Sequence, residues 1–284
     1  MKSVVVTGSS TGIGWGIAKV LIGKGFRVFG SVRKVEDGER LRKEFGPNFV
    51  PLYFDVTDAA AVAKGADQVA AALGGEMLCG LVNNAGIAVA GPLLYVKIDE
   101  FRHQIEVNLT GQLIVTQAFA PLLGADQDRT GASGRIVMIS SVGGQNGSPF
   151  VGPYAASKFA LEGYSQSLRR ELMLFGVDVI VIGPGAIATP IWDKAEGEDL
   201  NRFSNTPYAP MMARVADYMV TQGKKGLPPG DVGALIWKCL TDPKPKTRYA
   251  ILRNEFMDRT LPRMMNPRAV DKIIAKRLGF PEPS

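Results

Sequence analysis

Residues 3–14 read Ser-Val-Val-Val-Thr-Gly-Ser-Ser-Thr-Gly-Ile-Gly, and this stretch decides the fold of the 284-residue chain. The β-branched run predicts a buried strand, and the glycines predict a tight turn. The segment Gly12–Lys24 predicts a helix that ends before Gly25. A helix that starts at such a turn points its free N–H groups and positive dipole end towards the turn, where they can bind a phosphate.

The glycine turn is typical of a dinucleotide site. Gly8 allows the tight turn, Gly12 lets the backbone approach a pyrophosphate, and Gly14 permits close packing of helix on strand. The spacing is G-x-x-x-G-x-G, unlike the commonest fingerprint, and a glycine-rich turn without a ligand is the alternative. The strand–turn–helix context favours the dinucleotide. The expected contacts here are Gly8, Ser10, Thr11, Gly12, Ile13 and Gly14.

Further apolar runs alternate with helical segments along the chain. The predicted strands are Ser3–Thr7, Arg27–Val32, Phe49–Phe54, Met77–Val82, Arg135–Ser140, Val177–Ile182 and Thr247–Leu252. The other predicted helices are Asp58–Leu73, Asp99–Leu123, Tyr154–Phe175 and Asp231–Leu240. Continuous apolar strands are typical of a parallel sheet that is buried on both faces. We therefore predict a single doubly wound, Rossmann-type α/β domain with a seven-stranded parallel sheet.

We expect three parts in the chain: a Rossmann-fold catalytic domain over residues 1–252, a helical substrate lid at about 185–228 within it, and a C-terminal helical extension over residues 253–284. Gly124–Gly134 is polar and is expected to be a surface loop. The lid is rich in methionine and aromatic residues, which suit a lipophilic ligand. A small core of the lid itself is the alternative. The apolar and aromatic lid residues in question are Ile191, Trp192, Phe203, Tyr208, Met211, Met212, Tyr218 and Met219.

The net charge of +6 comes from the C-terminal residues 244–284. Residues 244–284 hold ten Lys/Arg against four Asp/Glu, whereas residues 1–243 hold 23 of each sign. Asn266-Pro267 and Gly279 bracket an amphipathic basic helix. This helix could pack on the domain, cover the substrate cleft or a neighbouring subunit, or lie on an anionic membrane. Nucleic-acid binding has no recognition motif to support it.

Cysteine, histidine and hydropathy narrow the class of protein. Cys79 and Cys239 cannot form a disulfide framework, and both lie in apolar runs, so buried free thiols are expected. His103 is the single histidine, and no metal-ligand cluster is predicted. The sequence contains no uninterrupted apolar run of about 18 residues and no recognisable secretory signal. We expect a cytoplasmic protein, with contact at a membrane surface as the alternative.

Residues after the second and third strands indicate which nucleotide is bound. Ser31-Val32-Arg33-Lys34 has no acid to hold a ribose 2′-hydroxyl and offers two cations instead. We therefore expect NADP(H), with Arg33 on the 2′-phosphate; a solvated turn is the alternative. Asp55, which is followed by Val56, can accept from an adenine amino group or can act as a turn residue.

Polar residues after the fourth strand and in the next helix suggest further contacts. Asn83-Asn84-Ala85-Gly86 can approach a cofactor through its backbone, and the asparagine amides can tie strands together. Asn108 precedes Leu109-Thr110-Gly111 inside a predicted helix. Asparagine and glycine are poor residues for a helix interior, so a local distortion with a functional polar group is expected there.

Ser141, Tyr154 and Lys158 form the sharpest constellation. Tyr154 and Lys158 are four residues apart, so they share one helix face. A cation beside a phenolate lowers the pKa of the tyrosine, which makes the pair a workable general acid/base. Ser141 ends the fifth strand, where its hydroxyl can hold a carbonyl oxygen. An ordinary helix surface would explain Tyr-x-x-x-Lys alone, but it does not explain the three residues together with the glycine turn.

These motifs occur in an order that resembles the classical short-chain dehydrogenases/reductases, over roughly residues 1–190. The matching pieces are Thr7–Gly14, Asp55, Asn83–Gly86, Asn108, Ser141, Tyr154 with Lys158, and Pro184-Gly185. The resemblance implies a catalytic tetrad. Tyr154 would move the proton, and Lys158 would lower its pKa and bind the nicotinamide ribose. Ser141 would orient the substrate oxygen, and Asn108 would hold a water of a proton relay.

The resemblance also implies the remaining cofactor contacts and the reaction. The expected contacts are Val56, Asn84, Ala85, Gly86, Tyr154, Lys158, Pro184, Gly185, Ile187 and Thr189. Ser141–Gly163 looks most like hydroxysteroid and retinol dehydrogenases. We expect an NADP(H)-dependent oxidoreductase, a homodimer or homotetramer, that interconverts an alcohol and a ketone or aldehyde on a steroid-, retinoid- or lipid-like substrate. A reductase of small or acyl carbonyls and a catalytically idle NADP(H)-binding sensor are the alternatives.

Overall fold

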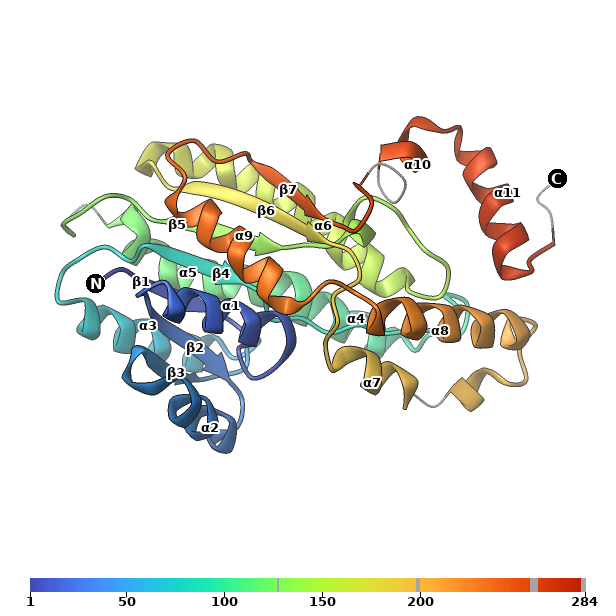
Figure 1. Ribbon diagram of the computed structural model, residues 1–284, viewed down its shortest axis with the longest axis horizontal. Helices are drawn as coiled ribbons and strands as arrows, with labels where there is room; N and C mark the ends of the chain where they lie inside the picture. Colours follow the sequence, from blue (N-terminus) through green and yellow to red (C-terminus); the bar gives the residue numbers. More distant parts are fainter. Residues whose placement is uncertain (127, 198–199, 256–259, 282–284) are drawn as a thin grey trace.

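Seven parallel strands form one sheet in the computed structural model, which describes residues 1–126, 128–197, 200–255 and 260–281 (Figure 1). The spatial order is β3-β2-β1-β4-β5-β6-β7. The strands are β1 (Ser3–Val6), β2 (Arg27–Val32), β3 (Phe49–Tyr53), β4 (Gly80–Asn83), β5 (Arg135–Ile139), β6 (Asp178–Pro184) and β7 (Arg248–Ile251). The strand order reverses at β1 and β4, so the predicted doubly wound α/β domain is confirmed.

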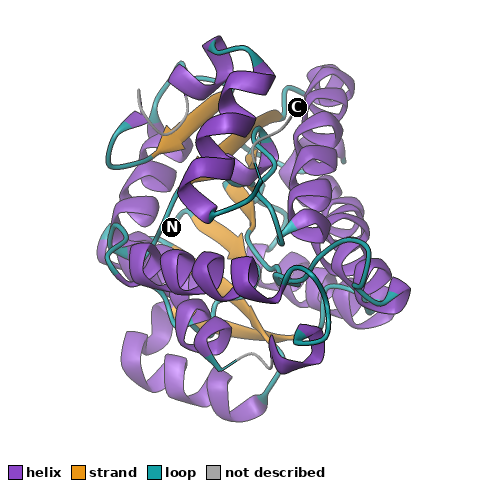
Figure 2. Cartoon of the chain, turned by 90° about the vertical axis from the view of Figure 1, so that its right-hand side faces the viewer, coloured by secondary structure: helices purple, strands orange, loops and turns teal. Residues whose placement is uncertain are grey.

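Helices cover both faces of the sheet (Figure 2). One face carries α1 (Gly12–Gly23), α2 (Val35–Phe45) and α9 (Pro229–Thr241), and the other carries α3 (Ala59–Leu73), α5 (Gly111–Ala120) and α6 (Gly152–Glu171). Along β1, Val5 belongs to the core on the second face, whereas Val4 and Val6 belong to the core on the first. Successive side chains point to opposite faces, which is why the strand reads as a continuous apolar run.

The predicted helix Asp99–Leu123 is divided in the structure. It consists of α4 (Ile98–Ile105), a π-helical turn (Glu106–Thr110), α5 and a second π-helical turn (Pro121–Ala125). The local distortion predicted at Asn108 is therefore present.

One helix, α2, is absent from the prediction. It carries many charged residues, and only two of its residues, Gly38 and Leu41, are buried. Its apolar periodicity is therefore weak. The packing of Leu41 against the sheet holds this helix in place.

The lid and the extension meet in a third apolar cluster. The lid contains α7 (Ile191–Glu196), a 3₁₀ turn (Leu200–Phe203) and α8 (Ala209–Lys224), and the extension contains α10 (Leu261–Met264) and α11 (Pro267–Leu278). The cluster contains buried Phe150, Phe203, Met212, Val215 and Leu278. Residues 198–199 of the lid, and 256–259 and 282–284 of the extension, lie outside the described residues.

Two glycines bring α1 and α9 close together on the first face. A Cβ at Gly16 would lie 2.6 Å from the Cβ of Pro229 and 2.7 Å from its carbonyl carbon. A Cβ at Gly233 would lie 2.8 Å from the carbonyl oxygen of Gly16. The helices contact each other through backbone here, so neither position has room for a side chain.

We expect Gly16→Ala to lower the free energy of unfolding by about 1–3 kcal/mol, because the methyl group overpacks the α1–α9 contact. Gly163→Ala is the matched control: it lies in α6, where the described residues leave open space around a Cβ. This change should be neutral or should stabilise by up to ~1 kcal/mol. Urea unfolding followed by circular dichroism measures both. A Gly16→Ala protein as stable as the wild type would contradict the close packing.

Candidate active site

The glycine turn brings the chain ends of β1 and β6 together. A Cβ at Gly14 would lie 2.1 Å from the carbonyl oxygen of Gly8, so the helix start is packed directly against the turn. Gly12 has φ +61°, and a Cβ there would lie 3.3 Å from the Cβ of Thr189. The structure therefore places Thr189 beside the turn, although 175 or more residues separate them in sequence.

Hydrogen bonds lock the carboxyl ends of β1 and β4 to each other. The Thr7 hydroxyl accepts from the backbone N–H groups of Asn84 and Ala85, both at 2.9 Å. The Asn84 amide donates to the carbonyls of Thr7 at 2.8 Å and Gly8 at 3.2 Å. Asn84 therefore ties the strands together, as its residue type suggested.

The residues expected at the adenosine end lie close together at the carboxyl ends of β2 and β3. Arg33 Nη1 is 3.7 Å from Asp55 Oδ2, and the Arg33 side chain is 73% exposed. Burial alone would raise the pKa of Asp55, but hydrogen bonds from Thr57 and the charge of Arg33 outweigh it and hold the pKa below its ordinary value. Asp55 is thus an anion that faces a cation and can still accept hydrogen bonds.

Arg40 is a cation near this end that the sequence analysis did not select. Its guanidinium donates to the carbonyl of Ser10 at 2.6 Å and pairs with Asp37 at 3.2 Å. It lies on α2, the helix that the apolar pattern did not predict. Had α2 been predicted, the spacing of Asp37 and Arg40, one helical turn apart, would have pointed to Arg40.

Asn108 braces the segment that follows β4. Its Oδ1 accepts from Ile87 N–H at 2.8 Å, and its Nδ2 donates to the Ile87 carbonyl at 3.0 Å and to Ser157 Oγ at 3.1 Å. Gln104 makes a similar pair of bonds, to Val89 N–H and the Ile87 carbonyl. Both amides are fully buried. Sequence reasoning missed Gln104, because a glutamine in a helix reads as a surface residue.

Ser141 and Tyr154 meet above the end of β5. The Ser141 hydroxyl accepts from Gly143 N–H at 3.0 Å and shares a hydrogen bond with the Tyr154 phenol. Burial raises the pKa of Tyr154 above its ordinary value, and the bond with Ser141 offsets this only in part. The phenol is therefore protonated at neutral pH, which is the form of a general acid.

Lys158 lies beside Tyr154, and its expected effect on the pKa of the phenol stays a prediction. Its Nζ donates to the Ile139 carbonyl at 2.7 Å and lies 5.7 Å from the centroid of the Tyr154 ring. Burial lowers the pKa of Lys158 to about 8, and the charge of Glu162 acts in the opposite direction. The ammonium is directed to the Ile139 carbonyl at the end of β5.

The other predicted contacts divide into exposed turns and buried side chains. Thr11 is exposed at the N-cap of α1, and Ser10 and Ile13 are half-buried. Val56 and Ile187 are core residues, at 4% and 3% exposure, so a cofactor would meet their backbone. Pro184 ends β6, and the next residue, Gly185, donates to the Ile251 carbonyl of β7. A Cβ at Gly86 would lie 3.1 Å from Asn108 Oδ1.

The lid residues contact each other and the loop between Ser141 and Tyr154. Trp192 donates to the Ile187 carbonyl at 2.7 Å, and its ring covers Gly223. The Phe150 ring, whose residue has φ +64°, stacks on Phe280 of the extension and meets Tyr208 edge-on. The lid therefore has a core of its own, as the alternative stated, and that core includes the loop and the extension.

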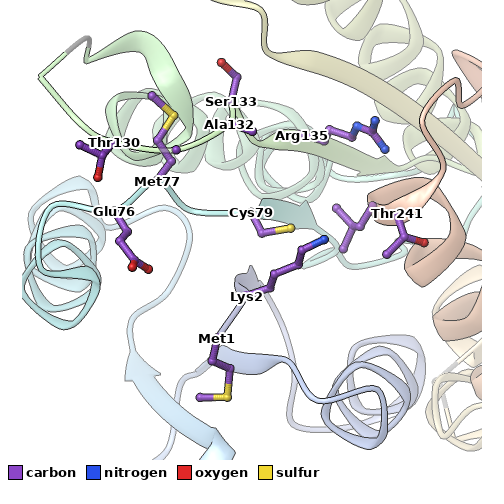
Figure 3. A pocket seen from close by; sticks show the side chains of 12 residues that line it. Met1, Lys2, Glu76, Met77, Cys79, Thr130, Ala132, Ser133, Arg135 and Thr241 are labelled. Atoms are coloured by element: carbon purple, nitrogen blue, oxygen red, sulfur yellow. The ribbon is translucent and has the colours of Figure 1, made fainter.

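A cavity of about 540 Å³ lies at the opposite end of the sheet (Figure 3). Lys2, Cys79 and Arg135 line it, at the amino ends of β1, β4 and β5. Ligands of open parallel sheets bind at the carboxyl ends. Burial also raises the pKa of the Cys79 thiol, so it is a poor nucleophile. This cavity is therefore a poor candidate for the active site, and the chemistry favours the carboxyl edge of the sheet.

The described residues also bear on metals and membranes. No group of three or more His, Cys, Asp or Glu within these residues is placed to hold a metal ion. Within the same part of the chain, no helix has the length and apolar character needed to cross a membrane.

Comparisons with known proteins agree with this geometry. Residues 2–199 match the family model of the short chain dehydrogenases. The chain is 39% identical over 278 residues, 98% of each protein, to an NADPH-dependent 3-dehydrocapnine reductase of Ornithobacterium rhinotracheale. It is 37% identical to retinol dehydrogenase 16 of Mus musculus over 68% of this chain and 59% of that protein. A short-chain dehydrogenase structure from Streptomyces avermitilis matches with a TM-score of 0.77 and 28% identity, covering 97% and 96% of the two chains.

We expect Asn108→Ala to lower the free energy of unfolding by about 2–4 kcal/mol without any cofactor, because the Ile87 N–H and Ser157 Oγ lose a buried partner and the Ile87 carbonyl keeps only Gln104. Chemical denaturation measures the change. Gln68→Ala is the control, since Gln68 is exposed and makes one long bond of 3.5 Å; it should cost under about 0.5 kcal/mol. If Asn108→Ala is as mild as the control, Asn108 is not a brace.

Proposed function

The chain belongs to the short-chain dehydrogenase family and is an oxidoreductase, and within that family we propose that it is an NADPH-dependent reductase of a lipophilic ketone. The observation that carries the proposal is the hydrogen-bonded pair of Ser141 and Tyr154, whose phenol is protonated, one helical turn from buried Lys158. A protonated acid beside a second hydroxyl suits a carbonyl oxygen that must gain a proton.

The proposed roles follow from these side chains. Ser141 donates a hydrogen bond to the substrate carbonyl oxygen, and Tyr154 transfers its proton to that oxygen as the alcohol forms. Lys158 binds the nicotinamide ribose and favours the phenolate that remains on Tyr154. The nicotinamide, when bound, supplies the hydride to the carbonyl carbon. Asn108 positions Ile87 and the helix that carries Tyr154, through Ser157.

A preference for NADPH is supported by charge at the adenosine end. Arg33 and Lys34, and no acid, directly follow β2; the Arg33 guanidinium is exposed there, and Arg40 contacts the turn at Ser10. Arg33 and Arg40 both have acidic neighbours, but two guanidinium groups beside the turn suit a 2′-phosphate of about two negative charges. The reductase from Ornithobacterium rhinotracheale is named as NADPH-dependent.

A lipophilic substrate is supported by the aromatic side chains beside Tyr154. Phe150 lies four residues before Tyr154, and Tyr95, Tyr208 and Phe280 form a chain of ring contacts with it, 5.8 to 6.0 Å between centroids. Tyr95 is 47% exposed, so part of this surface is open. The two relatives named for 3-dehydrocapnine and retinol are in line with such a substrate.

We also propose a homodimer or homotetramer and contact with an anionic membrane. Leu113 on α5 and Phe159 on α6 are exposed apolar residues that suit a subunit interface.

The proposed membrane contact is supported by α11. Lys272 and Lys276 are exposed there around Ile273, which suits an anionic lipid surface. Sedimentation and vesicle flotation test the two proposals; a monomer, or protein that never floats, would contradict them.

We expect Tyr154→Phe to lower kcat for ketone reduction by about 10²–10⁴-fold while NADPH still binds, because the general acid is removed. NADPH oxidation is followed with ketones of increasing chain length, and NADPH binding by fluorescence. Tyr164→Phe makes the same change on the same helix and should keep the wild-type rate. Wild-type and Tyr154→Phe proteins that bind NADPH and are equally inert would contradict the proposed activity, and no gain with chain length would contradict a lipophilic substrate.

We expect Arg33→Ala to raise KM for NADPH about 10–100-fold, since a hydrogen bond to a charged group contributes roughly 1.5–3 kcal/mol. KM for NADH should change less than about twofold, because NADH lacks the 2′-phosphate. Arg42→Ala removes an exposed guanidinium of α2 and serves as the control. Steady-state kinetics with both nucleotides measure the effect, and an unchanged NADPH/NADH ratio would exclude this role of Arg33.

A further inference from the structure

A buried ion pair joins α6 to the edge strand β7. Arg248 Nε donates to Glu162 Oε2 and Arg248 Nη2 donates to Glu162 Oε1, both at 3.0 Å. The side chains are 16% and 10% exposed. This parallel, two-bond geometry is the strongest form of an arginine–carboxylate contact. Two buried charges cost much solvation energy, so loss of one partner would leave the other charge buried and unpaired.

Two glycines make room for this pair. A Cβ at Gly183 of β6 would lie 2.5 Å from Arg248 Nη2, and one at Gly144 would lie 3.2 Å from Glu162 Cγ. Gly144 belongs to the 3₁₀ turn (Val142–Gly144) that Ser141 caps. The pair therefore extends from β7, past β6, to the underside of the turn that carries Ser141.

The same pair bears on Lys158. Glu162 follows Lys158 by one helical turn, and a Cβ at Gly144 would lie 3.0 Å from the Lys158 carbonyl oxygen. Among the described groups, Tyr154 and Glu162 of α6 are the titratable side chains that face Lys158, and β5 offers its Ile139 carbonyl. Arg248 of β7 reaches Lys158 only through its ion pair with Glu162. The amides that α4 and its π-helical turn bury towards α6 do not titrate.

We propose that Glu162 and Arg248 are a positioning pair for the reduction, which holds the Ser141 turn against the Lys158 turn of α6 and keeps Lys158 cationic. The inference rests on the proposed function. Glu162 supplies the negative charge that favours the Lys158 ammonium. Arg248 fixes that carboxylate in place, and its positive charge weakens the effect of Glu162 on the pKa of Lys158. Burial lowers the pKa of Lys158 and Glu162 opposes this, which gives the value of about 8.

Glu162→Gln tests the proposal through the pH profile of kcat/KM for reduction. In the wild type, activity should fall as pH rises through about 8, where Lys158 loses its proton. In the variant the fall should begin about one pH unit lower, because the anion is lost and Arg248 is left unopposed. That shift corresponds to a kcat/KM about tenfold below the wild type at pH 9, and nearly equal to it at pH 6.

A second variant and a control separate charge from shape. Glu162→Gln with Arg248→Gln removes both charges and should move the profile back towards the wild type. Asp99→Asn removes one exposed carboxylate, which pairs with Arg102 at 2.9 Å, and should leave the profile unchanged. Circular dichroism and NADPH fluorescence establish that each protein is folded and binds nucleotide.

The outcomes distinguish the two claims. A wild type that binds NADPH but reduces no ketone contradicts the proposed function. An active wild type, with Glu162→Gln lowering kcat/KM by one factor at every pH, overturns the positioning pair and leaves a structural contact. The same conclusion follows if Asp99→Asn shifts the profile as much as Glu162→Gln.

Discussion

The parallel pairing of β1, β4, β5 and β6 is the constraint on which the rest of the structure depends. Parallel strands end at the same edge, so the glycine turn after β1, the Asn84 segment after β4, Ser141 after β5 and Thr189 after β6 meet there. The close approach of Gly14 to the Gly8 carbonyl and the amide bonds of Asn84 then fix that edge. Its geometry is settled by backbone contacts before any ligand arrives.

Burial shifts the pKa values of the two titratable groups at this edge in opposite directions: it raises that of Tyr154 and lowers that of Lys158. It favours the neutral phenol of Tyr154 and also favours the neutral amine of Lys158, whose cation is retained by Glu162 and by the Ile139 carbonyl. A neutral acid beside a retained cation suits transfer of a proton to a carbonyl oxygen. The basic residues of the C-terminal extension lie apart from this chemistry. One of them, Arg277, contacts Tyr218 of the lid.

Sequence reasoning worked where one physical cause dominates. Continuous apolar runs predicted the strands, and the unfavourable Asn108 predicted a local distortion, which the structure shows to be a π-helical turn. It failed where the cause is tertiary. Glu162 and Arg248 are 86 residues apart, and a glutamate four residues after a lysine looks like a surface pair. The pKa of Tyr154 was expected to fall, yet burial raises it in the protein without nucleotide, and spacing along a helix does not reveal burial.

We propose that Tyr154 is held as a protonated acid until the reactants are in place. Ultraviolet titration of phenolate absorbance, taken as the difference between the wild type and Tyr154→Phe without nucleotide, measures this directly. We expect the signal of Tyr154 to appear only above pH ~10, the ordinary value for tyrosine, because burial raises its pKa. A phenolate that forms near neutral pH in the free protein would contradict it.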